Sequence, residues 1–229
     1  MLDFQNNLIQ NIEHKTFDLS LVDRLQLDSY TKNGQRFYNT PIGNVKSVTT
    51  IISEYLDKTW LENWRARIGE VEANGILETA KRRGRAIHTM AEDYIQGRDF
   101  IRSQHTVNIM DFRKVIPILN HHIDKIYGIE LPLYSHNLKT AGTADLVCRW
   151  DMYPTILDFK TARKPRDLEQ IEGYFIQASC YAMMFEELYN LHMDKIVIIM
   201  LVDHEDKPEI YEDYVYPHWS KKVNKIFKK

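Results

Sequence analysis

The sequence predicts an α/β fold, in which a mixed central sheet is flanked by helices and preceded by a helical N-terminal part. Three patterns predict it. From about Glu54 to Gly97, apolar side chains recur at spacings of three and four residues. From Ile129 onward the pattern changes to strand-like apolar runs. A long helical stretch, Asp167 to Leu191, then separates these runs from a buried strand at Lys195 to Asp203.

The segments before the sheet predict a hairpin and further helices. Asn33-Gly34 lies between two partly alternating runs, which is typical of a tight hairpin turn. Ser47 to Ile52 is either the end of a strand or the start of a helix. Val107 to Tyr127 predicts another helix, broken or kinked at Pro117.

The composition is that of an ordinary globular chain. Of its 229 residues 44% are hydrophobic and 27% charged, and the net charge of −2 gives no global sign of nucleic-acid binding. No apolar run approaches the ~20 residues that span a bilayer. The first fifteen residues lack the basic start and apolar core of a signal peptide. We therefore expect a cytoplasmic protein without a membrane partner.

Two strand-like runs flank the sequence DMYP (Asp151 to Pro154). If DMYP is a four-residue hairpin turn, Asp145 faces Lys160. Asp145 and Asp158 are then diagonal neighbours, about 7–8 Å apart at the backbone. Because side chains alternate along a strand, these three charged residues share one face of the sheet. A slip of two residues preserves this arrangement, but a slip of one does not. The opposite face is apolar and is predicted to be core: Leu146, Cys148, Trp150, Leu157 and Phe159.

The charged face of this hairpin indicates a metal site. Two neighbouring carboxylates repel each other unless a cation or a proton lies between them, and carboxylate oxygens suit Mg²⁺ or Mn²⁺. A lysine beside such an ion can position or deprotonate a water, or neutralise charge on a phosphate. These are the elements of metal-assisted phosphodiester hydrolysis. The alternative is a surface salt bridge between Lys160 and Asp145, because an acid-x-Lys tripeptide alone is common.

Four motifs in the same order resemble a nuclease superfamily. GTADLV (Gly142 to Val147) followed by ILDFKT (Ile156 to Thr161) resembles the core of the PD-(D/E)XK, or restriction-endonuclease-like, superfamily. GRAIH (Gly84 to His88) and QASCY (Gln177 to Tyr181) resemble two motifs of its RecB-like branch. The stretch that begins at RFYNTPIG (Arg36 to Gly43) is similar to the mitochondrial genome maintenance exonuclease and related phage exonucleases, which act on single-stranded DNA ends.

The resemblance implies a metal centre that holds one or two Mg²⁺ or Mn²⁺ ions. Its implied ligands are His88, Asp145, Asp158, the backbone carbonyl of Phe159 and, as an additional candidate, Glu130. Lys160 would be the catalytic lysine, acting beside Asp158 and Asp145. Outside the motif, His88 would be read as a core-edge histidine and Glu130 as an exposed strand-end carboxylate. Relatives with an iron–sulfur cluster use four cysteines, so the two cysteines of this chain predict no cluster.

The residues expected to contact DNA are Gln177, Tyr181, Arg85, Thr161, Ser47 and Thr49. Gln177 and Tyr181 share a helix face, although both could simply pack there. Arg85 belongs to the basic run Lys81 to Arg85, which is otherwise a solvated helix face. The two hydroxyl residues either donate to a phosphate or cap the following helix. Trp60 and Trp64 are expected in the core, with base stacking as the alternative.

The function expected from the resemblance is a metal-dependent DNA exonuclease, acting at single-stranded ends in DNA replication, recombination or repair, in a bacterial or phage-infected cell. One nuclease domain would span residues 1–229, with the hairpin and helical part in 1–100 and the catalytic sheet in 128–217. An endonuclease, nickase or junction resolvase would have the same fold. A catalytically silent DNA-binding accessory module is a second alternative. The sequence identifies no protein partner.

Overall fold

A mixed six-stranded sheet forms the centre of the protein, in the order β1-β5-β6-β7-β8-β9. Its strands are β1 (Asp18–Leu19), β5 (Ile123–Ser135), β6 (Thr140–Trp150), β7 (Tyr153–Ala162), β8 (Lys195–Val202) and β9 (Glu209–Tyr214). The pairs β1–β5 and β7–β8 are parallel, and the other neighbours are antiparallel. The computed structural model describes residues 14–57 and 59–228. The prediction that the N-terminus is not a signal peptide falls mainly on residues 1–13, which lie outside the described residues.

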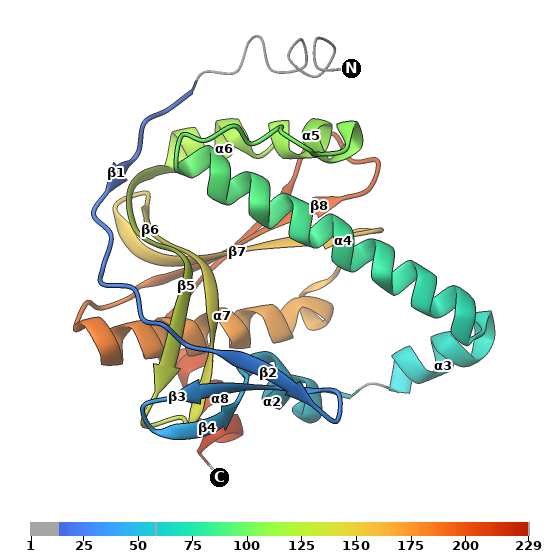
Figure 1. Cartoon of the computed structure of the whole chain (residues 1–229), viewed down its shortest axis with the longest axis horizontal. Coiled ribbons are helices and arrows are strands. Elements are labelled where there is room, and N and C mark those ends of the chain that lie inside the picture. The colour runs from blue at the N-terminus through green and yellow to red at the C-terminus, as the bar shows by residue number, and fades with distance from the viewer. Residues whose placement is uncertain (1–13, 58, 229) are drawn as a thin grey trace.

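Helices cover both faces of this sheet (Figure 1). They are α2 (Val48–Tyr55), α3 (Thr59–Ile68), α4 (Glu70–Ile95), α5 (Thr106–Arg113), α6 (Ile116–His122), α7 (Leu168–Tyr189) and α8 (Ser220–Phe227), with the irregular helical segment η1 (Val215–Trp219) before α8. One buried cluster joins α2, α7 and α8 to the sheet, and a second joins α4, α5 and α6 to it. The predicted mixed central sheet flanked by helices is therefore confirmed. Among the described residues, no helix combines the length and apolarity needed to cross a membrane.

The predicted N-terminal hairpin is confirmed and belongs to a separate three-stranded sheet. Its strands are β2 (Ser29–Lys32), β3 (Gln35–Thr40) and β4 (Gly43–Lys46). Asn33 and Gly34 join β2 to β3 with positive φ angles of 53° and 73°, as a two-residue hairpin turn requires. Ser47 follows β4 and begins α2, because its side chain accepts the backbone N–H of Thr50. The 47–52 segment is thus the start of a helix.

The helix expected from Val107 to Tyr127 is broken next to Pro117, as one of the two alternatives had it, but it ends earlier than expected. The chain forms α5 and α6 with a break between them, and residues 123–127 already belong to β5. Pro117 lies in the first turn of α6, where its missing N–H leaves no helical hydrogen bond unmade. The proline therefore begins a second helix and does not kink one continuous helix.

The β6–β7 hairpin turn is two residues long, which corrects the expected register by two. Trp150 pairs with Tyr153, and both residues of the turn, Asp151 and Met152, have positive φ angles of 47° and 73°. His122 at the end of α6 contacts the Asp151 carboxylate at 2.9 Å and thereby supports this turn. The slip of two residues preserves the predicted faces. Leu146 and Leu157 lie in the core beneath α4, while Val147 and Ile156 lie in the core beneath α7.

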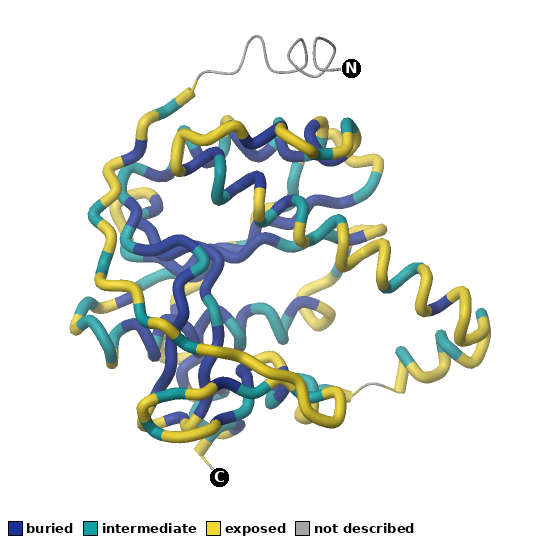
Figure 2. The backbone as a smooth tube through the Cα atoms, in the orientation of Figure 1, coloured by how far each residue is buried: buried dark blue, intermediate teal, exposed yellow. Residues whose placement is uncertain are grey.

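One part of the helical layer extends away from the sheet. Figure 2 shows that α3 and the first half of α4 are mostly exposed, whereas the second half of α4 lies on the sheet. Helix α3 has no buried residue, and α4 has only Ala73 buried before Ile87. The α3–α4 hairpin is therefore held by few core contacts of its own.

Candidate metal centre

The candidate site lies where β6 and β7 stop pairing. Their backbone pairing extends from Trp150–Tyr153 to Leu146–Leu157. One residue further on, the carboxylate of Asp145 accepts the backbone N–H of Phe159 at 2.9 Å. The Asp145 carboxylate therefore replaces the backbone carbonyl oxygen that would accept this hydrogen bond in a regular sheet. This anchors Asp145 between the two strands as they separate.

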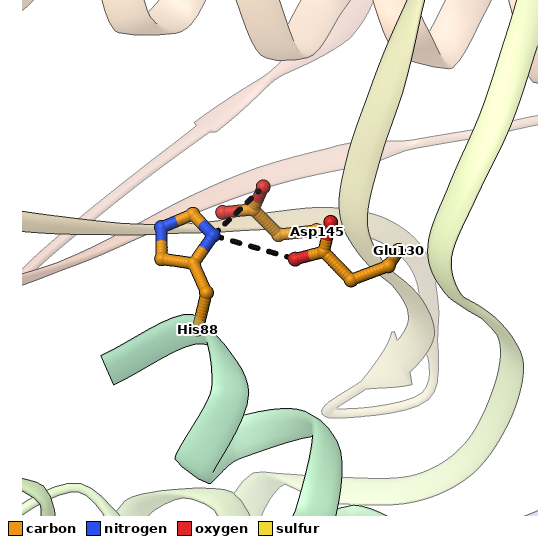
Figure 3. Close-up of side chains that lie close together, drawn as sticks. All are labelled: His88, Glu130 and Asp145. Carbon is orange, nitrogen blue, oxygen red and sulfur yellow. Dashed lines mark hydrogen bonds and ion pairs between the residues drawn. The ribbon is translucent and has the colours of Figure 1, made fainter. Parts of the chain in front are cut away.

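Three side chains from three different elements converge at this point (Figure 3). His88 comes from α4, Glu130 from β5 and Asp145 from β6. Nδ1 of His88 lies 3.4 Å from Oε1 of Glu130 and 3.5 Å from Oδ1 of Asp145. One donor atom of each residue lies within 4.8 Å of the other two, close enough for a single ion to contact all three. Glu130, the additional candidate in the sequence, is thus a full member of the cluster.

Glu130 reaches the cluster through an unusual backbone conformation. Its φ angle is +43°, in the left-handed region that residues with a Cβ seldom adopt inside a strand. The alternation of β5 changes there, because Ile129 packs in the core beneath α4 and Leu131 in the core beneath α7. Such a conformation costs on the order of 1 kcal/mol or more and is concentrated at functional sites. The kink places the Glu130 carboxylate beside Asp145.

The orientation of His88 is fixed by a backbone carbonyl. Its Nε2 lies 3.1 Å from the carbonyl oxygen of Phe159, which accepts a hydrogen bond from it. Nδ1 therefore faces the carboxylates and is the nitrogen available to a metal. Metal-binding histidines commonly donate their other N–H in this way, which sets the tautomer. In this arrangement the Phe159 carbonyl, expected to be a ligand, holds the histidine ligand in place.

Asp158 and Lys160 form a second, adjoining pair. Asp158 is almost fully buried, and its carboxylate makes an ion pair with the Lys160 ammonium. Gln177 of α7 donates to the other oxygen of Asp158 at 3.2 Å. The ring centroid of Tyr174 lies 5.1 Å from Nζ of Lys160. We did not anticipate Tyr174, but it lies three residues before Gln177 on the same helix face.

Burial and mutual charge shift the pKa values of these groups. Burial alone lowers the pKa of His88, but the nearby Glu130, Asp145 and Asp158 reverse this effect and raise it to about 9. Burial raises the pKa of Asp158 to about 6 although Lys160 lowers it. Burial also raises the pKa of Asp145. The pKa of Lys160 is lowered by burial but raised overall by Asp158 and Asp145, so the ammonium is charged at neutral pH.

The residues expected to contact DNA fall into two groups, those that are buried and those that are at least partly exposed. Tyr181 is buried, and a Cβ at Gly142 would lie 2.6 Å from its ring, so Tyr181 packs on the β6 backbone and DNA cannot reach it in this conformation. Ser47 is buried as the cap of α2, so its hydroxyl is not available to a phosphate either. Gln177 and Thr161 are half-buried beside the site. Thr49 and Arg85 are exposed and remain accessible.

The basic run Lys81 to Arg85 is not a uniform surface. Arg83 turns inward and makes ion pairs with Asp111 of α5 and Asp203 after β8. It also donates to the carbonyl oxygens of Ala162 and Leu201 at the ends of two neighbouring strands. Arg82 and Arg85 are exposed. Arg83 therefore attaches α4 to the sheet five residues before His88.

The expectation that Trp60 and Trp64 are core residues is wrong. Trp60 is 63% exposed and Trp64 is half-buried, in a helix without any buried residue. Their spacing of four places them on one helix face, but that face packs on no core. The signal for a core helix was local periodicity, which does not reveal whether a partner surface is present.

The donor set of the cluster suits a divalent ion. Oxygen donors from Glu130 and Asp145 match the preference of Mg²⁺ and Mn²⁺, and one imidazole nitrogen is compatible with Mn²⁺ in particular. The raised pKa of His88 shows that the acids make this position favourable for positive charge. No protein-family model matches the chain, and a search of curated proteins gives no match. The assignment of this site therefore depends on its own geometry.

Proposed function

We propose that the protein is a metal-dependent DNA exonuclease of the PD-(D/E)XK superfamily, RecB-like branch, which hydrolyses phosphodiester bonds at single-stranded ends. The observation that carries the proposal is the convergence of His88, Glu130 and Asp145 beside the buried Asp158–Lys160 pair. An ion cluster with a structural role alone would not need a ligand-like histidine, a strained glutamate and a charged lysine at one strand opening.

His88, Glu130 and Asp145 would hold Mg²⁺ or Mn²⁺, with Asp158 on the adjoining side. Such an ion, when bound, would polarise the scissile phosphate and lower the pKa of a water. The water oxygen would form the new bond to phosphorus and lose its proton to solvent. The bond from phosphorus to the 3′ oxygen would break, and that oxygen would take up a proton.

Lys160 would stabilise charge in this reaction and would not remove a proton. Its pKa is raised by Asp158 and Asp145, so the ammonium keeps its proton at neutral pH. A fixed cation beside the phosphate stabilises the negative charge that builds up in the transition state. Asp158 holds the Lys160 ammonium in position, and Gln177 in turn holds the Asp158 carboxylate. Tyr174 covers the ammonium from the side of α7.

The side chains exposed on the α3–α4 hairpin favour a single-stranded substrate over a duplex. It presents Trp60, whose ring is 63% exposed, together with the cations Arg82 and Arg85. Aromatic rings that stack on bases and cations that contact phosphates are the usual means of binding a single strand without sequence preference. A paired duplex would not offer its bases to such a surface.

The proposal is tested by cleavage of an end-labelled linear single strand and a closed circular single strand, in Mg²⁺, Mn²⁺ and EDTA. The linear strand should be degraded only with metal, and the circle should stay intact. Lys160→Ala should reduce the rate by about 10³-fold or more, as loss of a transition-state donor does, while Lys221→Ala, at an exposed lysine of α8 outside the site, should change it little.

Cleavage of the circle would assign an endonuclease on the same fold. Binding of the linear strand without cleavage in either metal would assign a DNA-binding accessory module. Unchanged activity in Lys160→Ala would show that the β6–β7 opening is not the active site.

A further inference from the structure

A pocket of about 400 Å³ lies next to the metal centre, between α4 and the end of β7. Ile76, Thr79 and Ala80 of α4 line one side. Thr161 and Arg163 line the other. The volume is within the usual range for small-molecule sites, about 300–1,000 Å³, and is sufficient for one nucleobase.

Both walls of the pocket belong to elements that also carry residues of the candidate site, α4 with His88 and β7 with Lys160. Along α4, Gly84 lies one helical turn before His88, and a Cβ at Gly84 would lie 3.9 Å from Oγ1 of Thr161. Along β7, Thr161 directly follows Lys160. A strand with its phosphate at the metal centre would therefore place a neighbouring nucleotide at this pocket.

An ion pair lines the pocket, and exposed cations lie on the segments beside it. Arg83 and Asp203 both line the pocket and are ion-paired with each other. The exposed cations nearby are Arg163 and Lys164 on the segment after β7 and Arg82 on α4. A neutral, partly apolar interior suits a base, which carries no charge, and a cationic rim suits the phosphates on either side of it.

We infer that this pocket is a subsite for one unpaired nucleotide of the substrate strand, with its base against Ile76 and Ala80 and its phosphate at Arg163. The inference depends on the proposed nuclease function and adds to it the position of a base next to the cleaved bond. It also accounts for Thr79 and Thr161, whose hydroxyl groups can donate to base edges or phosphate oxygens without selecting one base.

The test measures binding of two labelled strands to the full-length protein in a Lys160→Ala background, which prevents cleavage. One strand is a twelve-nucleotide oligo(dT), and the other is an abasic strand with the same phosphates. Ile76→Trp fills the pocket and should weaken oligo(dT) binding about tenfold, the magnitude of one lost stacked base. Binding of the abasic strand should not change. Ala80→Leu, a smaller filling change, should act in the same direction.

Val71→Trp is the matched control, because Val71 is on the same helix but 89% exposed and outside the pocket. It should leave the affinity for both strands unchanged. Arg163→Gln should weaken both strands equally, as loss of a phosphate contact does. Circular dichroism and thermal melting establish that each variant folds.

The possible outcomes distinguish failure of the subsite from failure of the proposed function. If oligo(dT) binds but neither filling variant weakens it relative to the abasic strand, the pocket holds no base and only the subsite is overturned. If Ile76→Trp and Ala80→Leu weaken both strands equally, the pocket walls contact the backbone and the base assignment is wrong. If the parent protein binds neither strand, the subsite and the proposed function are both overturned.

Discussion

The two halves of helix α4 serve different purposes. In the second half, Ile87, Met90, Ala91, Tyr94 and Ile95 are buried against the sheet. In the first half, Ala73 is the one buried residue of α4 before Ile87. The same helix is therefore core at one end and exposed at the other (Figure 2).

Two residues with distinct contacts, Arg83 and His88, lie at the boundary between these halves. Arg83 attaches the helix to the ends of β7 and β8, and His88 reaches the metal centre five residues later. The comparison indicates that the core fixes the position of His88. The exposed half has few packing contacts to maintain, so its surface is free to bind a ligand.

The largest expected effect on stability concerns Arg83, which attaches α4 to the sheet. Arg83→Met should lower the free energy of unfolding by about 2–3 kcal/mol, because it leaves Asp111 and Asp203 without their shared cation. Arg82→Met, at the neighbouring exposed position, should change it by about 0.5 kcal/mol or less. Urea denaturation at pH 7 measures both. Equal effects of the two variants would show that α4 has no such boundary.

The next effect concerns the pH dependence of metal binding at His88. Because its pKa is raised to about 9, the imidazole must lose a proton before Nδ1 can bind an ion. Mn²⁺ affinity should therefore rise with pH, by up to about tenfold per unit between pH 6.5 and 9. Below the pKa of Asp158, about 6, protonation of that carboxylate should weaken binding further.

Calorimetric titration with Mn²⁺ at several pH values measures this dependence. His88→Ala should bind more weakly and show little change between pH 6.5 and 9. A variant that keeps the full slope would mean that the proton comes from another group, and that the buried half of α4 does not supply the ligand.

The smallest expected effect concerns Trp60 in the exposed half of the hairpin. Trp60→Ala should weaken single-strand binding by about 1 kcal/mol, roughly fivefold, through loss of base stacking. Thermal stability should hardly change, because α3 has no buried residue. Tyr214→Ala is the control, since this exposed residue of β9 pairs through its backbone with Lys195 at the start of β8, away from the candidate site. If Trp60→Ala lowers thermal stability but leaves single-strand binding unchanged, Trp60 packs against the protein and does not stack on bases.

Local patterns in the sequence determined most elements and one face of the site. The Asn33-Gly34 turn requires positive φ angles that these residues tolerate, and the structure has them. The helix 168–189 begins after Asp167, whose side chain caps it. Asp145, Asp158 and Lys160 share a face because side chains alternate along strands, and this result holds in the corrected register. Each of these features depends on neighbours within a few residues or on one hairpin.

Contacts between distant segments decided the rest. His122 supports the two-residue turn at Asp151 from 29 residues away, which the sequence of the turn does not reveal. The left-handed conformation of Glu130 lies between two residues of β5 that both pair with β6. Its place beside His88 therefore follows from the pairing of the sheet. Trp60 has the periodicity of a core residue, yet no residue of its helix is buried. A sequence pattern specifies which side chains point the same way, but only the folded chain determines what they face, because burial and proximity are created by long-range packing.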